Sequence, residues 1–190
     1  TLNRLPAIRN QNPYGACWAF ATFSSLESNF LTQGLGNEID LAEMFTAFFV
    51  YGDKRPGKSF GLNHANKNIL SQGGNSGQVT ALTSRLGTVN EETLPYPTNK
   101  SSYDEPELLP EEYEKTNIRI KETYQLGVLS GDAMMNTVKD LIMNKGAVYI
   151  HYYSKSGAYQ TPSNEETIYF NNETDEDGNH MPINHAVAIV

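Results

Sequence analysis

The chain has 190 residues, a formal net charge of -8 and 38% hydrophobic residues. This length allows one domain or two small lobes, and the negative charge argues against nucleic acid or an anionic membrane surface as a partner. Because the sequence has no run of eighteen apolar residues, we expect no membrane insertion.

The first half of the chain carries helical patterns. Apolar residues recur at three- and four-residue intervals over residues 18–31, which predicts an amphipathic helix. A second helix is expected from Asp40, because Glu43 follows three residues later and the two together predict a capping box. Ser76 is expected to cap a third helix that ends at Gly87.

The second half carries mostly strand patterns. The acidic, Pro-containing stretch 98–114 predicts a surface connection between two halves. Beyond it, apolar alternation and helical spacing predict a strand, a short helix and three further strands, at 118–124, 132–144, 148–153, 167–170 and 185–190. The order therefore indicates an α+β fold, with a helical lobe followed by a β lobe.

The chain has one cysteine, Cys17, in the run Gly15-Ala16-Cys17-Trp18. The glycine allows a tight turn, and the helix predicted next places the thiol in its first turn. A helix N-terminus carries unpaired N–H groups and a partial positive charge, which favour a thiolate. The sequence therefore predicts a reactive sulfur, and a single cysteine excludes an internal disulfide.

A thiolate nucleophile needs a proton carrier beside it, and imidazole is the side chain that titrates near neutral pH. His185 stands at the start of the apolar strand predicted over 185–190, and a strand is a rigid element that can hold a catalytic side chain in place. The other histidines, His64, His151 and His180, lack metal-ligand spacing. We therefore expect neither a metal nor another cofactor.

Several motifs in chain order resemble the papain-like cysteine peptidases. They are Gln11, Gly15-Ala16-Cys17-Trp18-Ala19-Phe20, the pair Gly73-Gly74, Leu94-Pro95-Tyr96, and Asn184-His185-Ala186-Val187. The resemblance implies a two-lobe fold with a helical lobe over residues 1–112 and an antiparallel, barrel-like β lobe over residues 113–190 that lacks its last strands.

The resemblance also implies the roles of individual residues. Cys17 would be the nucleophile, His185 the acid and base, and Gln11 an oxyanion donor beside the Cys17 N–H. The implied substrate-binding residues are Gly15, Trp18, Gly73, Gly74, His151 and Ala186. The implied reaction is hydrolysis of peptide bonds in a peptide or protein substrate, through an acyl-enzyme thioester.

The sequence departs from the family pattern in three places. Tyr14 and Ser71 stand where many members have a pair of cysteines. The interval from Cys17 to His185 is longer than the roughly 130 to 150 residues typical of papain-like enzymes. The chain reaches Val190 without the family's orienting asparagine, so we expect activity to need a complementary C-terminal fragment.

The disulfide-free form resembles bacterial members, which are often exported or cell-surface proteins with a pro-segment. We therefore expect an extracellular or cell-surface location, with a cytoplasmic one left open. Two other functions also stay open: an inactive family member acting as a binding or scaffold protein, and a thiol acyltransferase on the same fold.

Overall fold

The computed structural model describes residues 4–52, 69–99, 116–126, 131–155, 159–160, 168–169 and 174–190. The expected lobe boundary at 112/113, most of the acidic stretch 98–114 and His64 lie outside these residues. The described helices and strands are α1 (Cys17–Thr32), α2 (Glu43–Ala47), η2 (Phe48–Gly52), η3 (Ile69–Ser71), α3 (Ser76–Arg85), α5 (Gly131–Lys145), β1 (Val148–Tyr152), β2 (Tyr159–Gln160), β3 (Ile168–Tyr169) and β4 (His185–Ile189).

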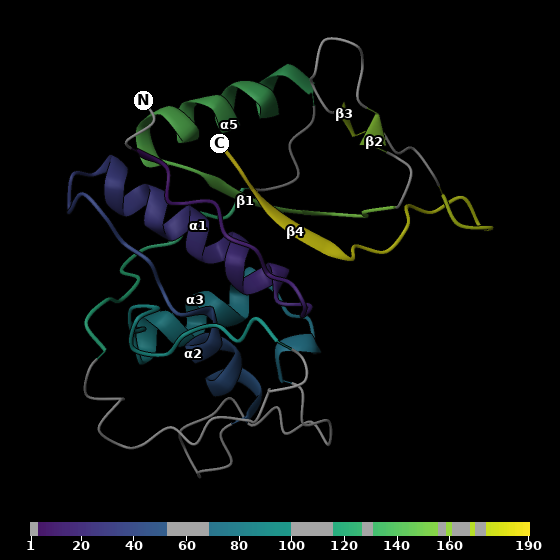
Figure 1. Ribbon diagram of the computed structural model, residues 1–190. Coiled ribbons are helices and arrows are strands. Elements are labelled where there is room, and N and C mark those ends of the chain that lie inside the picture. The colour runs from purple at the N-terminus through teal and green to yellow at the C-terminus, as the bar shows by residue number, and fades with distance from the viewer. Residues whose placement is uncertain are drawn as a thin grey trace.

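Helix α1 lies in the middle of the molecule, with α2 and α3 on one side and β1, β4 and α5 on the other (Figure 1). It confirms the helix predicted over residues 18–31. Trp18 and Phe23 are completely buried on the side of α1 that joins the main hydrophobic core. Most of that core comes from α1, α2, η2 and α3, so the helical part of the chain is the better packed one.

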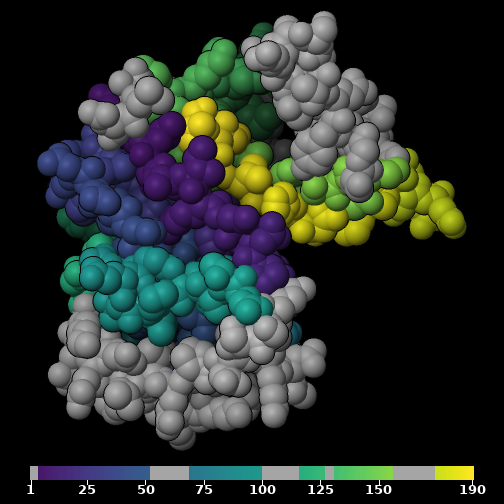
Figure 2. Space-filling view, in the orientation of Figure 1, coloured from purple at the N-terminus to yellow at the C-terminus, as the bar shows by residue number. Residues whose placement is uncertain are grey.

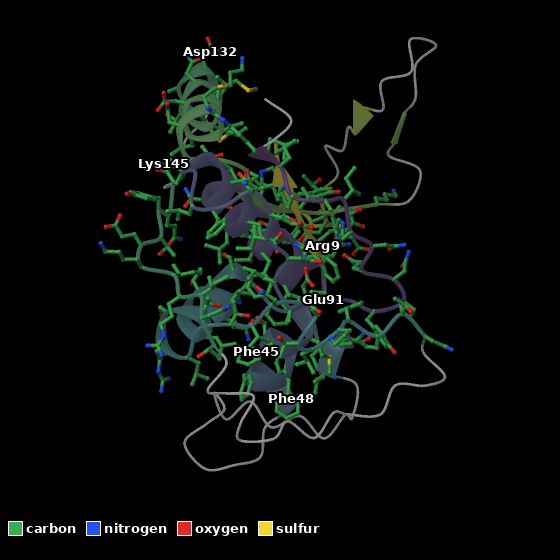
Figure 3. The ribbon with its side chains drawn as sticks, turned by 60° about the vertical axis from the view of Figure 1, so that its left-hand side comes forward. Arg9, Phe45, Phe48, Glu91, Asp132 and Lys145 are labelled. Carbon is green, nitrogen blue, oxygen red and sulfur yellow. The ribbon has the colours of Figure 1, made fainter. Side chains whose placement is uncertain are left out.

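The capping box predicted from Asp40 and Glu43 is wrong. The residue before α2 is Ala42, and no side chain caps the helix. The two carboxylates instead face Arg9, whose Nη1 lies 2.7 Å from an oxygen of each. Arg9 and Glu91 lie near the centre of the molecule, and Phe45 and Phe48 lie further toward its helical end (Figure 3). Contacts with Arg9, which comes from a distant segment, have therefore replaced the local cap.

The cap of helix α3 is Asn75, one residue before the predicted cap Ser76, and it forms a capping box with Gln78. Asn75 is extended, and its side chain accepts a hydrogen bond from the Gln78 N–H at 3.1 Å. The Gln78 side chain in turn accepts from the Asn75 N–H at 2.9 Å. Ser76 is therefore the first residue of α3 and not its cap.

The sheets are small and antiparallel. Strand β1 pairs with β4 so that Tyr152 stands opposite His185 and His151 opposite Ala186, and β2 pairs with β3. The strand predicted over 118–124 is wrong, because Ile118 makes one bridge to Thr88 and residues 121–125 are exposed. Within the described residues the second half thus forms two-stranded sheets and no closed barrel.

Hydrogen bonds connect the residue before β1 to α1. Ser25 Oγ donates to the Ala147 carbonyl at 2.5 Å, and the Ala147 N–H donates to Ser28 Oγ at 2.9 Å. Gly146 has φ +103°, and a Cβ there would lie 2.7 Å from the Ser28 backbone carbon, so only glycine fits this approach. The sheet is therefore held in place by the helix that begins with Cys17.

On the face in Figure 2, the N-terminal residues (purple) lie between the C-terminal strand (yellow) and the teal residues of the helical part. In the part of the chain that the structure describes, no helix has the length and apolar character to cross a bilayer.

Candidate active site

Cys17 is the first residue of α1 and is half-buried. Ala16 precedes it, no side chain caps the helix, and the first turn contains no acidic residue. The first intrahelical bonds to the Ala16 carbonyl come from the N–H groups of Ala19 and Phe20. Cys17 thus stands at the positive end of the helix dipole, where no side-chain cap and no acidic residue of the first turn offsets the unpaired N–H groups.

Hydrogen bonds stabilise the loop before Cys17 and connect it to Tyr96. The Gln11 carbonyl accepts from the Tyr14 N–H at 3.1 Å and from the Tyr96 hydroxyl at 2.7 Å. The Gln11 side-chain Nε2 donates to the Tyr14 carbonyl at 3.1 Å. An amide nitrogen has two N–H donors, so one is used to shape the loop that leads to the nucleophile.

Tyr14 occupies the position where the sequence departs from the family pattern. Its ring is buried and meets the ring of Tyr96 edge-on at 6.0 Å, and its hydroxyl donates to the Asn99 carbonyl at 3.2 Å. The neighbouring Gly15 is exposed, and its backbone lies next to that of Ser71. The two positions that lack cysteines are therefore close in space.

Trp18 is completely buried, so its indole is a packing group in this structure and offers no surface to a substrate. It meets Tyr51 edge-on at 5.9 Å, and a Cβ at Gly74 would overlap the indole ring. Packing against Trp18 therefore leaves no room for a side chain at Gly74. At Gly73, with φ +74°, an added Cβ would meet no atom of the described residues within 4 Å, and the Gly73 carbonyl accepts from the Tyr51 hydroxyl at 3.1 Å.

His185 is the first residue of β4 and is half-buried. The ring of Tyr152, its partner on β1, lies 5.7 Å away. The side chain of Asn184 accepts from the Ser154 N–H at 2.6 Å and donates to the Ser154 carbonyl at 2.9 Å. The strand pairing thus continues beyond His185, which holds the imidazole on an ordered strand end.

Burial lowers the pKa of His185 below its usual value of 6.5, because removal from water disfavours the charged imidazolium. A nearby negative charge would instead raise the pKa of an imidazole. The imidazole would thus hold a proton more readily beside a thiolate than beside a neutral thiol.

The helix that begins with Cys17 packs against the strand that begins with His185. Ala186, the next residue of β4, is buried at 6% exposure, and His151 opposite it on β1 is exposed. Two residues that stand almost a whole chain apart in sequence are thereby carried by elements in direct contact.

Two tyrosines have pKa values to which Cys17 contributes: Tyr96, which belongs to the motif Leu94-Pro95-Tyr96, and Tyr149, which the sequence analysis did not single out. Burial raises the pKa of Tyr149, and the Cys17 charge raises it further, while hydrogen bonds from Ser76 lower it. Burial also raises the pKa of Tyr96, with Cys17 among the smaller causes. The signal available for Tyr149 was its two-residue spacing from His151 on the same strand.

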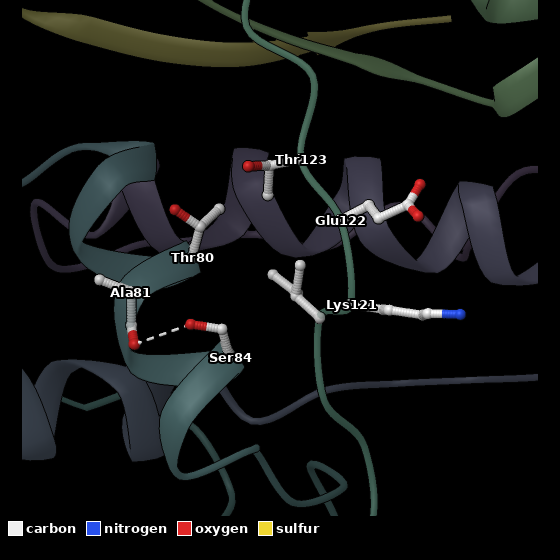
Figure 4. Close-up of a pocket in the computed structure, with 7 residues that line it drawn as sticks. Thr80, Ala81, Ser84, Lys121, Glu122 and Thr123 are labelled. Atoms are coloured by element: carbon white, nitrogen blue, oxygen red, sulfur yellow. Dashed lines mark hydrogen bonds between the residues drawn. The ribbon is translucent and has the colours of Figure 1, made fainter.

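A cavity of about 190 Å³ lies apart from these residues, between α3 and the extended segment 120–123 (Figure 4). Its lining comprises Thr80, Ala81, Ser84, Ile120, Lys121, Glu122 and Thr123. None of the predicted site residues lines it. No cluster of His, Cys, Asp and Glu that could hold a metal ion occurs within the described ranges.

Comparison with known proteins supplies the family. The family model described as "Papain family cysteine protease" matches residues 2–190. The chain belongs to the papain family of cysteine proteases. The papain-like fold expected from the sequence is confirmed, with the correction that the described sheets do not close into a barrel.

Solved structures of other proteins share this fold at low sequence identity. The clostridial cysteine protease Cwp84 is 24% identical with a TM-score of 0.70, and the match covers 100% of this chain and 41% of that one. Digestive procathepsin L 3 of Tenebrio molitor larval midgut is 17% identical with a TM-score of 0.63, covering 100% and 52%.

A short stretch is more similar to curated sequences. The viral cathepsin of Autographa californica nuclear polyhedrosis virus is 59% identical over 29 residues, which are 15% of this chain and 9% of that protein. The chain matches well under two thirds of the length of each of these relatives.

Proposed function

We propose that this papain-family chain carries the catalytic residues of a cysteine peptidase. The observation that supports the proposal most directly is the uncapped start of α1 at Cys17, packed against the strand that starts at His185. A helix end would favour a thiolate at Cys17, and the strand that packs against this helix carries the imidazole of His185.

In the proposed reaction, the Cys17 thiol gives its proton to His185 and the resulting thiolate attacks the peptide carbonyl carbon. The Cys17 N–H and the free N–H of the Gln11 amide donate to the oxyanion. The C–N bond then breaks as His185 returns the proton to the leaving amine. Water, deprotonated by His185, attacks the thioester and releases the acid and the thiol.

The peptidase proposal also includes a two-lobe organisation, a pro-segment and a location outside the cell or at its surface. The described helices and the β1–β4 sheet are consistent with a helical lobe over 1–112 and a β lobe over 113–190. A pro-segment is proposed because neighbouring structures are named procathepsin or are described after propeptide cleavage. An extracellular or cell-surface location is proposed because Cwp84 is described as a surface layer associated protein of Clostridium difficile.

The test uses a peptidyl epoxide probe and fluorogenic peptides on the protein and on its Cys17→Ala, His185→Ala and Gln11→Ala variants. The sole cysteine makes the site of labelling unambiguous by mass spectrometry. We expect labelling at Cys17, with turnover reduced roughly 10²- to 10⁴-fold by His185→Ala and roughly 10²- to 10³-fold by Gln11→Ala. Exposed His180→Ala is the matched control and leaves turnover unchanged.

Labelling that proceeds at the rate of an ordinary thiol, whether or not His185 is present, would contradict the proposal and favour a scaffold protein. Transfer of the acyl group to an added amine in preference to water, measured by product analysis, would favour an acyltransferase.

A further inference from the structure

Tyr96 connects the loop that carries Gln11 to the helix that carries Cys17. Its ring meets the ring of Phe20 edge-on at 4.9 Å, and Phe20 follows Cys17 by three positions in α1. Its hydroxyl donates to the Gln11 carbonyl at 2.7 Å. One side chain therefore contacts both the helix of the proposed nucleophile and the residue proposed as an oxyanion donor.

The turn from Gln11 to Tyr14 limits where the Gln11 side chain can lie. The Gln11 carbonyl accepts from the Tyr14 N–H, and the Gln11 side-chain Nε2 donates to the Tyr14 carbonyl, both at 3.1 Å. The ring of Tyr96 also meets the ring of Tyr14 edge-on at 6.0 Å. The orientation of the Gln11 amide thus depends on this turn, and Tyr96 contacts both ends of it.

Tyr96 is itself held firmly. It is 9% exposed and belongs to the main hydrophobic core. Its backbone N–H donates to the carboxylate of Glu91. Leaving a buried hydroxyl without a partner costs free energy, so the Tyr96 hydroxyl favours the arrangement in which it stays on the Gln11 carbonyl.

We propose that Tyr96 is a positioning residue for oxyanion stabilisation, whose hydroxyl binds the Gln11 carbonyl and thereby keeps the Gln11 amide in place beside the Cys17 N–H. The inference rests on the proposed peptidase function, in which Gln11 donates to the oxyanion. Such a donor is effective because it is already in place when the charge develops. A displaced donor therefore slows the chemical step and leaves substrate binding unchanged.

The test measures kcat and KM for a fluorogenic peptide with the protein, Tyr96→Phe, Gln11→Ala and the double variant. Tyr96→Phe is expected to lower kcat roughly 5- to 30-fold, the range for coupled residues in contact, and to leave KM within about twofold. In the Gln11→Ala background the same substitution is expected to change kcat by less than about twofold, because no amide is left to position.

Two controls make the result specific. Phenylalanine keeps the ring, and the Gln11 carbonyl keeps the Tyr14 N–H as a donor, so the fold is expected to persist. Tyr124→Phe removes the hydroxyl of a tyrosine that is 66% exposed and donates to Glu122, and it is expected to leave kcat unchanged. Alkylation of Cys17 by iodoacetamide needs a thiolate and no oxyanion donor, so its rate is expected to be the same in Tyr96→Phe.

The inference is overturned if Tyr96→Phe keeps full kcat, if it lowers kcat by the same factor with and without Gln11, or if it slows the alkylation equally. NMR of the Cys17→Ala protein reads the position of the amide without chemistry. The two Gln11 Nε2 protons, assigned by their loss in Gln11→Ala, are expected to shift and broaden with Tyr96→Phe and not with Tyr124→Phe. If Gln11→Ala itself keeps full kcat, the oxyanion role in the proposed function fails, whereas unchanged amide resonances in Tyr96→Phe would refute the positioning role.

Discussion

Replacing the buried carboxylate of Glu43 by an amide tests how the core around Arg9 holds its charges. Glu27 and Glu43 are completely buried, while the side chain of Asp40 is 52% exposed. Arg9 lies 2.5 Å from Glu27, which also accepts from the Leu41 N–H at 2.7 Å. One guanidinium thus faces three carboxylates, and it cannot neutralise them all.

Of the three carboxylates, Glu43 is the one least stabilised by hydrogen bonds. It lies 2.7 Å from Arg9 Nη1, but neither of its oxygens makes a well-aligned hydrogen bond to any part of the chain that the structure describes. Burial raises the pKa of Glu43 from 4.5 to about 8, against the opposing charge of Arg9. The proton therefore belongs on Glu43 at neutral pH.

The folded protein then binds this proton more tightly than the unfolded chain does. The contribution of Glu43 is fully favourable below pH 4.5 and is progressively lost as the pH rises toward 8. At about 1.36 kcal/mol per pH unit, the loss by pH 7 is roughly 3 kcal/mol. Glu43→Gln resembles the protonated form, so it is expected to match the protein at pH 4.5 and to be about 3 kcal/mol more stable at pH 7.

The assay is urea unfolding of the protein and of Glu43→Gln at pH 4.5, 6, 7 and 8, with the exposed Glu92→Gln as the matched control. The control is expected to follow the protein at every pH. The reasoning is refuted if Glu43→Gln is less stable than the protein at pH 7, because that result requires an ionised Glu43 whose pair with Arg9 outweighs its burial.

Two further substitutions test the packing around the site. Gly74→Ala forces a methyl group into the indole of Trp18, whereas Gly73→Ala has a positive φ but would meet no atom of the described residues within 4 Å. The free energy of unfolding of Gly74→Ala should therefore fall about 1 to 3 kcal/mol further than that of Gly73→Ala. Equal losses in urea unfolding would show that the indole is not the constraint. Asn184→Ala removes both hydrogen bonds to Ser154. If this costs about 1 kcal/mol of local stability, hydrogen exchange at the Ser154 amide should become about fivefold faster. Unchanged exchange would mean that the Asn184 side chain does not hold the strand end.

Local patterns predicted the elements that are stabilised by their own residues. Helices α1 and α5 follow from regular apolar spacing, β1 follows from alternation, and β4 follows from the apolar run after His185. The strand predicted over 118–124 failed because alternation alone supplies no partner, and Ile118 makes a single bridge. The cap predicted at Asp40 failed because Arg9 binds both carboxylates from a segment outside the local pattern.

The sequence by itself determined that one thiol starts a helix and that one histidine starts an apolar strand, because both depend on residues within a few positions of each. Only the tertiary structure decided what surrounds them. Packing of β4 against α1, the burial of Trp18 and the sharing of Arg9 among carboxylates are contacts between distant segments. Their energies come from burial and charge in the folded chain, which no short sequence window contains.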